Sequence, residues 1–356
     1  METIIKRIDL EREKPEDAEI FCEASRILKK GGLVAFPTET VYGLGGDALM
    51  PCAAQNIYAA KGRPSDNPLI VHIGDFDAVD KLAKNVSEDA HKLMKAFWPG
   101  PMTLIFEKQE MVPKETTGGL DTVAVRFPSH PVALRLIRES GVYVAAPSAN
   151  LSGRPSPTRA EHVIEDLDGR IDMILDGGPV AIGLESTIID VSGKTPVILR
   201  PGYITKEQIA GILGRIEVDP AILEEHVQEH LVAKAPGMKY KHYAPKGQLI
   251  LVEGGSMEQV STRINQLVEE AMGQNKKVAV IATKESRDCY KAPLVVTIGS
   301  RQDEESVAHN LFAILREMDT RGIEMIYCES FEREQLGQAI MNRLLKAAGY
   351  HVLHLN

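Results

Sequence analysis

The sequence of 356 residues is poor in cysteine and contains no long apolar run. Its four cysteines are far apart and form no Cys-x-x-Cys pair, which disfavours a disulfide framework or a zinc finger. Nothing approaches the roughly 18 consecutive apolar residues of a membrane-spanning helix, and the N-terminal segment lacks the apolar stretch of a signal peptide. These absences predict a cytoplasmic protein with reduced cysteines and no membrane segment.

An excess of positive charge is also missing. Lysine and arginine total 41 against 50 aspartates and glutamates, which gives a formal net charge of −9. Tight non-specific binding to nucleic acid depends on clustered lysine and arginine, so strong direct binding to RNA is disfavoured. The G-x-x-x-x-G-K-[ST] pattern is absent as well, so ATP, if it is used, is not held by a P-loop.

The composition and the order of patterns predict a folded α/β or α+β protein with two domains. Hydrophobic residues make up 44% of the chain and charged residues 26%, and the length suits two domains of about 150 residues each. Strand-like runs alternate with helical patterns in residues 1–203 and again in a smaller, Rossmann-like parallel domain over 248–356. Residues 204–247 read as a linker. Helices are expected near residues 15–30, 52–61, 88–97, 131–140, 159–167, 257–272, 304–318 and 334–348, the one at 159–167 with a capping box of Thr158 and Glu161.

The densest polar motif is FPTETVYGLGGDA, residues 36–48, directly after a predicted strand. Gly43, Gly45 and Ala48 have the G-x-G-x-x-A spacing of a dinucleotide fingerprint. A nicotinamide site would also need an acidic residue about 20 residues on, and KGRPSDNP stands there instead. Two threonines, a glutamate and a tyrosine at a strand end indicate recognition of a small polar ligand.

Four cations lie at positions suited to an anionic ligand. Lys61 and Arg63 are two residues apart in a loop stiffened by prolines, and Arg126 and Arg200 end predicted strands. Each could be an ordinary surface residue. Together they could converge on phosphate or carboxylate oxygens, because guanidinium and ammonium groups bind such oxygens strongly.

Two further polar segments follow or begin strands. AAPSANLSG, residues 145–153, offers Ser148 and Asn150 among small side chains, and it lacks the G-x-S-x-G pattern of a serine hydrolase. Ser186 lies in a second patch, ESTI. The H-x-x-E-H pattern at residues 226–230 matches a zinc motif, but the segment is charged and has no third ligand nearby, so we interpret it as a solvated helix.

With these motifs assembled, the sequence resembles the threonylcarbamoyl-AMP synthase family, in its long two-domain form with a YrdC-type catalytic domain. The resemblance spans nearly the whole chain and rests on seven segments in the family's order: FPTETVYGL, KGRPSDNPL, VAVRFPSHP, PSANLSG, LESTIID, RPG and PGMKYKHYAP. It implies a twisted mixed sheet with flanking helices, followed by the smaller Rossmann-like domain. It also implies a nucleotidyltransferase that joins L-threonine, bicarbonate and ATP, with Mg²⁺ on the nucleotide, and releases pyrophosphate.

The same resemblance implies the site residues. L-Threonine is expected at Thr38, Thr40, His72, Arg126 and Ser186. ATP is expected at Lys61, Arg63, Asn67, Thr122, Ser148, Asn150, Ser156, Arg200 and Tyr243, with Lys61 and Arg63 as the catalytic cations and Tyr243 of the linker closing over the nucleotide. No protein side chain is expected to ligate a metal.

Two other functions stay open at this stage. One is an RNA-binding module, which a strong and steeply salt-dependent gel shift would support. The other is a carbamoyltransferase-related nucleotide-binding protein, which dependence on carbamoyl phosphate would support. For the synthase, the resemblance implies a downstream tRNA threonylcarbamoyltransferase as the partner in making threonylcarbamoyladenosine (t6A).

Overall fold

The computed structural model describes residues 2–10, 12, 14–222, 235 and 242–355. The chain divides into two compact units, one built mainly from the first 222 residues and the other from residues 153–155 and 242–355. The histidines of the rejected zinc pattern, His226 and His230, lie outside the described residues, as does Tyr240 of the linker. No helix in the described part of the chain is long and apolar enough to cross a membrane.

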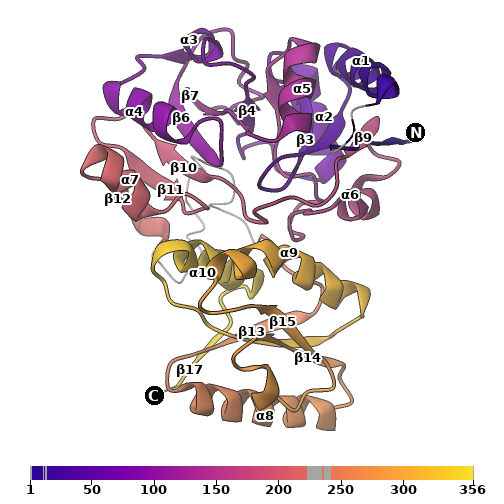
Figure 1. Ribbon diagram of the computed structural model, residues 1–356, viewed down its shortest axis with the longest axis vertical. Helices are drawn as coiled ribbons and strands as arrows, with labels where there is room; N and C mark the ends of the chain where they lie inside the picture. Colours follow the sequence, from indigo (N-terminus) through magenta and orange to yellow (C-terminus); the bar gives the residue numbers. More distant parts are fainter. Residues whose placement is uncertain (1, 11, 13, 223–234, 236–241, 356) are drawn as a thin grey trace. The chain divides into compact units, whose positions relative to one another are not determined.

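A mixed sheet forms the framework of the first unit (Figure 1). Across the described residues it has twelve strands, in the order β1-β9-β2-β3-β8-β4-β7-β6-β10-β11-β12, with β5 paired to β6. The strands are β1 (Ile4–Arg7), β2 (Val34–Pro37), β3 (Tyr42–Asp47), β4 (Ile70–His72), β5 (Ala83–Lys84), β6 (Met102–Lys108), β7 (Thr122–Arg126), β8 (Val144–Ala145), β9 (Met173–Asp176), β10 (Thr187–Asp190), β11 (Val197–Arg200) and β12 (Glu217–Val218).

The helices of this unit begin and end where the local chemistry favours it. They are α1 (Pro15–Lys29), α2 (Pro51–Lys61), α3 (Ala78–Leu82), α4 (Glu88–Phe97), α5 (Pro131–Ser140), α6 (Ala160–Leu167) and α7 (Lys206–Leu213). Proline stands at the first position of α1, α2 and α5, where its missing N–H costs nothing. Gly62 ends α2 at φ 60°, a left-handed conformation that glycine adopts without strain. Helix α2 therefore stops at Lys61 and delivers Arg63 into the following loop.

One element was not expected and one local expectation is wrong. Gly43 and Gly45 lie in strand β3, where a Cβ at position 45 would lie 2.7 Å from both Phe36 and Val144, so packing requires glycine there. The capping box of Thr158 and Glu161 is not formed, because α6 starts at Ala160 and places Glu161 one position too early. The Thr158 N–H donates instead to His162 Nδ1 at 3.2 Å.

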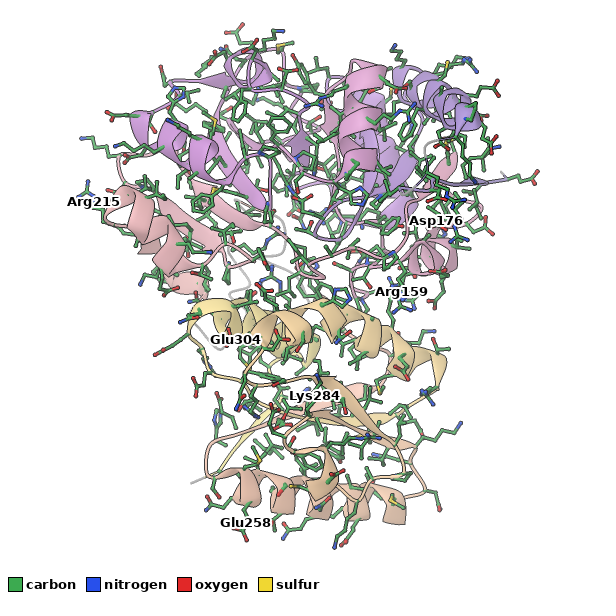
Figure 2. All side chains as sticks on the ribbon, viewed as in Figure 1. Arg159, Asp176, Arg215, Glu258, Lys284 and Glu304 are labelled. Atoms are coloured by element: carbon green, nitrogen blue, oxygen red, sulfur yellow. The ribbon has the colours of Figure 1, made fainter. Side chains whose placement is uncertain are left out.

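The second unit is a parallel α/β domain. Its strands are β13 (Gln248–Glu253), β14 (Val278–Thr283), β15 (Val295–Gly299), β16 (Met325–Glu329) and β17 (Val352–His354), in the order β15-β14-β16-β13-β17. Helix α8 (Met257–Gly273) covers one face, and α9 (Glu304–Thr320) and α10 (Gln335–Ala347) cover the other (Figure 1). Charged side chains such as Glu258 on α8 point outward (Figure 2). The predicted fold class, a mixed sheet followed by a smaller parallel domain, is confirmed.

Candidate active site

A row of polar side chains crosses three neighbouring strands of the first unit. His72 on β4 is in register with Arg126 on β7, and Arg126 is in register with Thr103 on β6. Residues in register on adjacent strands point to the same face of a sheet, so these three side chains share one face. The hydroxyls of Thr103 and Ser186 are 2.7 Å apart, which extends the row to the loop before β10.

Arg126 is the centre of this row. Its side chain is only 5% exposed, and its Nη2 donates to Glu39 Oε1 at 2.8 Å and to Thr40 Oγ1 at 2.9 Å. The other oxygen of Glu39 accepts from the Ser129 N–H at 3.2 Å. Arg126 Nε is buried and has no hydrogen-bond partner within the described residues. A buried donor without a partner is costly, so this nitrogen is suited to receive an oxygen of a bound ligand.

His72 is neutral at physiological pH. Its ring is buried, and burial followed by the nearby Arg126 charge lowers its pKa from 6.5 to about 3. Its Nδ1 lies 3.1 Å from the Ile70 carbonyl oxygen, which fits the tautomer with the proton on Nδ1. In that tautomer Nε2 is an acceptor.

The turn between β2 and β3 brings the two threonines to Arg126. Thr38 Oγ1 lies 2.8 Å from Thr40 Oγ1 and donates to the Val41 carbonyl at 2.6 Å, which fixes the turn. The backbone of this turn also accepts from the Ile182 and Gly183 N–H groups at 2.9 and 3.0 Å. Segments near residues 40, 126 and 183 are therefore held together, although they are far apart in the sequence.

Arg200, the last residue of β11, contacts the end of the same row. Its Nη2 donates to the Ser186 carbonyl oxygen at 2.9 Å and lies 3.3 Å from Ser186 Oγ. Both side chains are buried. Hydrogen bonds or strand register thus connect six predicted residues: Thr38, Thr40, His72, Arg126, Ser186 and Arg200.

A second group forms around Lys61. Its ammonium is buried and donates to the carbonyl oxygens of Ser148 and Asn150, each at 2.5 Å. Ser148 Oγ in turn donates to Asn150 Oδ1 at 2.6 Å. Strand β3 meets this segment through a bridge between Gly43 and Ser148. The lysine therefore fixes the loop after β8, next to the strand that follows the threonine turn.

The remaining predicted residues of the first unit are less closely connected. Arg63 Nη2 donates to the Asn67 carbonyl oxygen at 3.4 Å, and Asn67 Oδ1 is buried with no partner in the described part of the chain. Ser156 Oγ donates to Glu185 Oε1 at 2.6 Å. Thr122 begins β7, and four strand steps of about 3.3 Å place it about 13 Å from Arg126 on the same face.

Tyr243 belongs to the second unit. Its ring is buried there, 5.1 Å from the ring of Phe312 and 5.8 Å from the Arg343 guanidinium. Its expected contact with the nucleotide stays a prediction.

Three residues of these groups are absent from the expected threonine and ATP contacts: Glu39, Thr103 and Glu185. All three are buried, and each hydrogen-bonds a predicted site residue. Glu39 and Glu185 could have been found, because each lies inside a polar motif and a carboxylate is rarely buried without a partner. Thr103 lies in an apolar run and carries no such signal.

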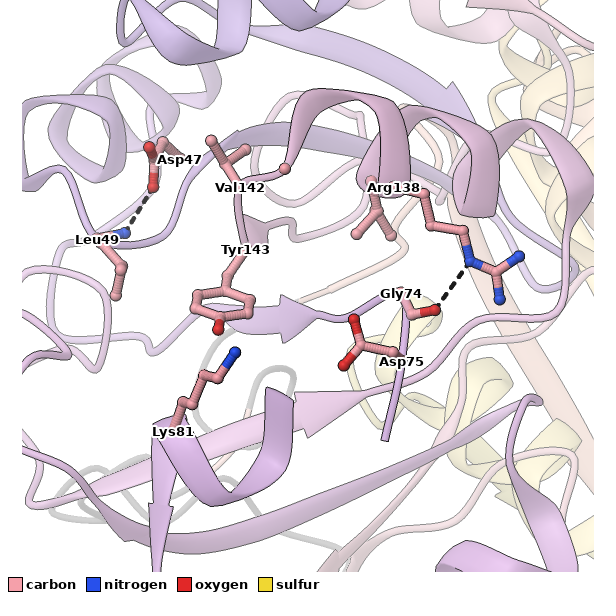
Figure 3. Close-up of a pocket in the computed structure, with 10 residues that line it drawn as sticks. Asp47, Leu49, Gly74, Asp75, Lys81, Arg138, Val142 and Tyr143 are labelled. Carbon is pink, nitrogen blue, oxygen red and sulfur yellow. Dashed lines mark hydrogen bonds between the residues drawn. The ribbon is translucent and has the colours of Figure 1, made fainter. Parts of the chain in front are cut away.

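The first unit also has a cavity of about 380 Å³ that is separate from the two groups of polar residues described above (Figure 3). Asp47, Asp75, Lys81, Arg138 and Tyr143 contribute to its wall, and none of the predicted site residues lines it. Asp47 ends β3, whereas the threonine turn precedes that strand, so about 17 Å of strand separates the two places. In Figure 3 Arg138 donates from Nε to the Gly74 carbonyl, at 2.9 Å.

Comparison with known proteins identifies the family. The Sua5/YciO/YrdC model, described as "Telomere recombination", matches residues 26–202, and the model of the threonylcarbamoyl-AMP synthase C-terminal domain matches residues 204–349. The threonylcarbamoyl-AMP synthase of Pyrococcus abyssi is 48% identical over 96% of this chain and 97% of that protein. The Bacillus subtilis protein of the same name is 49% identical over 93% of each chain.

A solved structure agrees over the full length. The crystal structure of P. abyssi Sua5 complexed with L-threonine superposes with a TM-score of 0.92 at 47% identity, covering 99% of this chain and 100% of that one. Both family models, the two relatives and this structure point the same way, and the chain belongs to the threonylcarbamoyl-AMP synthase family.

Proposed function

We propose that the protein makes L-threonylcarbamoyl-AMP from L-threonine, bicarbonate and ATP and releases pyrophosphate, as the first step of t6A synthesis on tRNA. The observation that carries the proposal is made at Arg126, a buried arginine whose Nε has no hydrogen-bond partner among the described residues and which lies beside two threonine hydroxyls and a neutral histidine. This set of groups is complementary to a small amino acid with a carboxylate and a hydroxyl. The relatives named threonylcarbamoyl-AMP synthase and the threonine complex of P. abyssi Sua5 support the same reaction.

In this proposal Arg126 binds the threonine carboxylate. Glu39 holds the guanidinium in place, and Thr38, Thr40 and Ser186 offer hydroxyls to the polar groups of the substrate. His72, being neutral, accepts a hydrogen bond at Nε2 from the amine or hydroxyl without repelling a cation. The amine attacks the carbon of bicarbonate, and loss of water leaves a carbamate.

ATP, carrying Mg²⁺, is proposed to bind along the Lys61 and Arg200 side of the site. The full set of proposed contacts is Lys61, Arg63, Asn67, Thr122, Ser148, Asn150, Ser156, Arg200 and Tyr243. A carbamate oxygen attacks the α-phosphorus, the bond from that phosphorus to the bridging oxygen breaks, and pyrophosphate leaves. Negative charge builds on the phosphoryl oxygens, so Lys61 and Arg63, the proposed catalytic cations, can stabilise the transition state together with Arg200. Lys61 also holds the loop that carries Ser148.

The remaining parts of the proposal concern surroundings. We propose a cytoplasmic enzyme that passes its product to a tRNA threonylcarbamoyltransferase. We also propose that the chain has a catalytic domain over 1–203, a lid over 204–247 and an accessory domain over 248–356. A carbamate hydrolyses readily in water, which gives a lid a physical purpose.

The test is synthesis from purified components. The protein is incubated with ATP, Mg²⁺, bicarbonate and L-threonine, and the adenylate is detected by mass, with Arg63→Ala and Lys61→Ala in parallel. We expect pyrophosphate release that requires threonine and is reduced in both variants. Pyrophosphate release that requires carbamoyl phosphate, or that does not depend on threonine, would contradict the proposal.

A further inference from the structure

The second unit has a cavity at the place where parallel sheets commonly bind ligands. Strands β13 and β16 are neighbours in the sheet. After β13 the chain crosses through α8 to β14 on one side, and after β16 it crosses through α10 to β17 on the other side. The two connections therefore leave this pair of strands in opposite directions. A crevice outside the carboxyl ends of two such strands is the usual binding position in open α/β sheets. Here it is a cavity of about 250 Å³, lined by Gly254, Gly255, Met257, Val260, Arg301, Glu329 and Ser330.

A buried carboxylate holds an arginine at this cavity. The Glu329 side chain is 2% exposed; its Oε1 accepts from the Thr283 N–H at 2.7 Å and from the Ser286 hydroxyl, and its Oε2 pairs with Arg301 Nη2. Arg301 Nη2 also donates to the Ser330 carbonyl at 3.0 Å, and the guanidinium lies 5.2 Å from the Phe331 ring centre. The arginine is thus fixed in one orientation.

Part of this guanidinium is available to a ligand. Of its five N–H bonds, those on Nη2 are used, whereas Nη1 and Nε have no partner within the described residues. Arg301 Nε is itself buried, whereas the side chain as a whole stays 32% exposed, so Nη1 is the nitrogen that solvent or a ligand reaches. A fixed, partly exposed guanidinium is a specific donor to oxygen anions.

The glycine pair before α8 adds backbone donors. Gly254 and Gly255 have φ of 91° and 71°, and a Cβ at Gly254 would lie 2.7 Å from the Leu355 carbonyl oxygen. The last backbone hydrogen bond between the β13 and β16 segments runs from the Ser330 N–H to the Val252 carbonyl oxygen, at 3.2 Å. The N–H groups of Gly254 and Gly255, which follow β13, have no partner in the described chain. Residues with side chains would be strained in this backbone conformation, so glycine is required at both positions. Because both glycines line the cavity, their N–H groups can donate to a ligand in it.

We propose that this cavity binds the phosphate group of a small metabolite. The donors come from two sources, the fixed Arg301 and the glycine amides leading into α8, and this combination is typical of phosphate recognition. The volume, 250 Å³, is below the roughly 300–1,000 Å³ of most sites for larger ligands, so only a phosphate and a small substituent fit inside. The proposal is independent of the synthase reaction.

The experiment measures binding at the glycine amides of the full-length protein. ¹⁵N-labelled protein is titrated with inorganic phosphate, with sodium chloride at matched ionic strength and with acetate, and the amide signals of Gly254 and Gly255 are followed by NMR. We expect both signals to move and saturate with phosphate, and to move little with chloride. An equal response to acetate would replace the phosphate assignment by a carboxylate site and overturn it.

Two variants at one position separate this cavity from the catalytic unit, which also attracts anions. Met257 lines the cavity, is 43% exposed and opens α8, where a glutamate is well tolerated by the helix dipole. Met257→Glu should abolish the phosphate response of the glycine amides, and Met257→Gln should keep it. Absence of a response in the unsubstituted protein up to tens of millimolar phosphate, or an unchanged response in Met257→Glu, would overturn the proposal.

Discussion

Each unit places an arginine and a glutamate in contact near its strand ends, but the two pairs are buried differently. Arg126 and Glu39 are 5% and 9% exposed, whereas Arg301 is 32% exposed and only Glu329, at 2%, is fully enclosed. A buried ion pair costs desolvation energy on both sides, and the second pair avoids part of that cost by leaving its cation at the surface. The first pair bears the full desolvation cost and leaves Arg126 Nε without a partner in the described chain, which is the arrangement that the proposed threonine site requires.

The two arginine–glutamate pairs also differ in the polar groups that surround them. Around Arg126, polar side chains from four separate segments meet on one face of the sheet. Around Arg301, the buried polar groups hydrogen-bond Glu329, and within the described residues the groups without a partner at the cavity surface are the amides of two glycines and Arg301 Nη1. The first arrangement fits a substrate with several functional groups, and the second fits a single anionic group.

The largest effect is expected from removing the buried arginine. Arg126→Met should lower kcat/KM for threonine by roughly a thousandfold, about 4 kcal/mol, because the substrate carboxylate loses its cation and Glu39 stays buried without one. Steady-state pyrophosphate release at varied threonine measures this.

Arg138→Met is the matched control. This arginine lies in the same unit, is exposed, and lines the cavity of Figure 3 instead of the polar row. Synthesis should stay within about twofold of the unsubstituted enzyme, as for most surface changes. A loss as large as that of Arg126→Met would place the chemistry in that cavity and refute the assignment.

The next test replaces the glutamate of each arginine–glutamate pair by glutamine. Glu39→Gln should reduce kcat/KM for threonine about seventyfold, and Glu329→Gln should lower the free energy of unfolding of the second unit by about 2.5 kcal/mol, since each carboxylate accepts charged or multiple hydrogen bonds. Threonine kinetics and urea unfolding are measured on both variants. If Glu329→Gln impaired threonine use as strongly as Glu39→Gln, the functional contrast between the pairs would be lost.

The fold class was predictable from the sequence because strand and helix patterns and their boundary residues are local. Pro51 and Gly62 bracket α2, and the structure gives Pro51–Lys61 where residues 52–61 were expected. Strand β3 was missed because it is rich in glycine; at Gly45 the packing against Phe36 and Val144 requires glycine, which no local pattern reveals.

The site was only partly predictable. Cations and hydroxyls in conspicuous motifs, such as Arg126 and Thr40, could be named, but their partners across strands could not. Thr103 is found only through the register of β6 with β7. In the second unit, Gly255, Arg301 and Glu329 are far apart in sequence and form no motif, so only the sheet topology brings them to one cavity.

A smaller effect is expected from His72 and concerns stability rather than turnover. Its folded pKa of about 3 lies below the ordinary 6.5, so the unfolded chain binds the extra proton between these values. The stabilising contribution is complete above about pH 6.5 and is lost as pH falls toward 3, about 2 kcal/mol between pH 7 and 5. Urea unfolding at both pH values should show a shallower pH dependence in His72→Gln than in the unsubstituted protein; equal slopes would mean that His72 titrates normally.

The smallest effect is expected at Thr103, the one member of the polar row that lies in no polar motif. Thr103→Val keeps the shape and β-branching of the side chain but removes the hydroxyl that lies 2.7 Å from Ser186 Oγ. Losing one neutral hydrogen bond should raise KM for threonine about fivefold, equivalent to about 1 kcal/mol, with KM for ATP unchanged.

Thr116→Val is the control, because that buried threonine donates to the Ala48 carbonyl at 2.7 Å, outside the row. This variant should be less stable without a change in KM for threonine. A raised KM for threonine in both variants would mean that Thr103 acts through general packing, and the first unit's polar row would then end at Arg126.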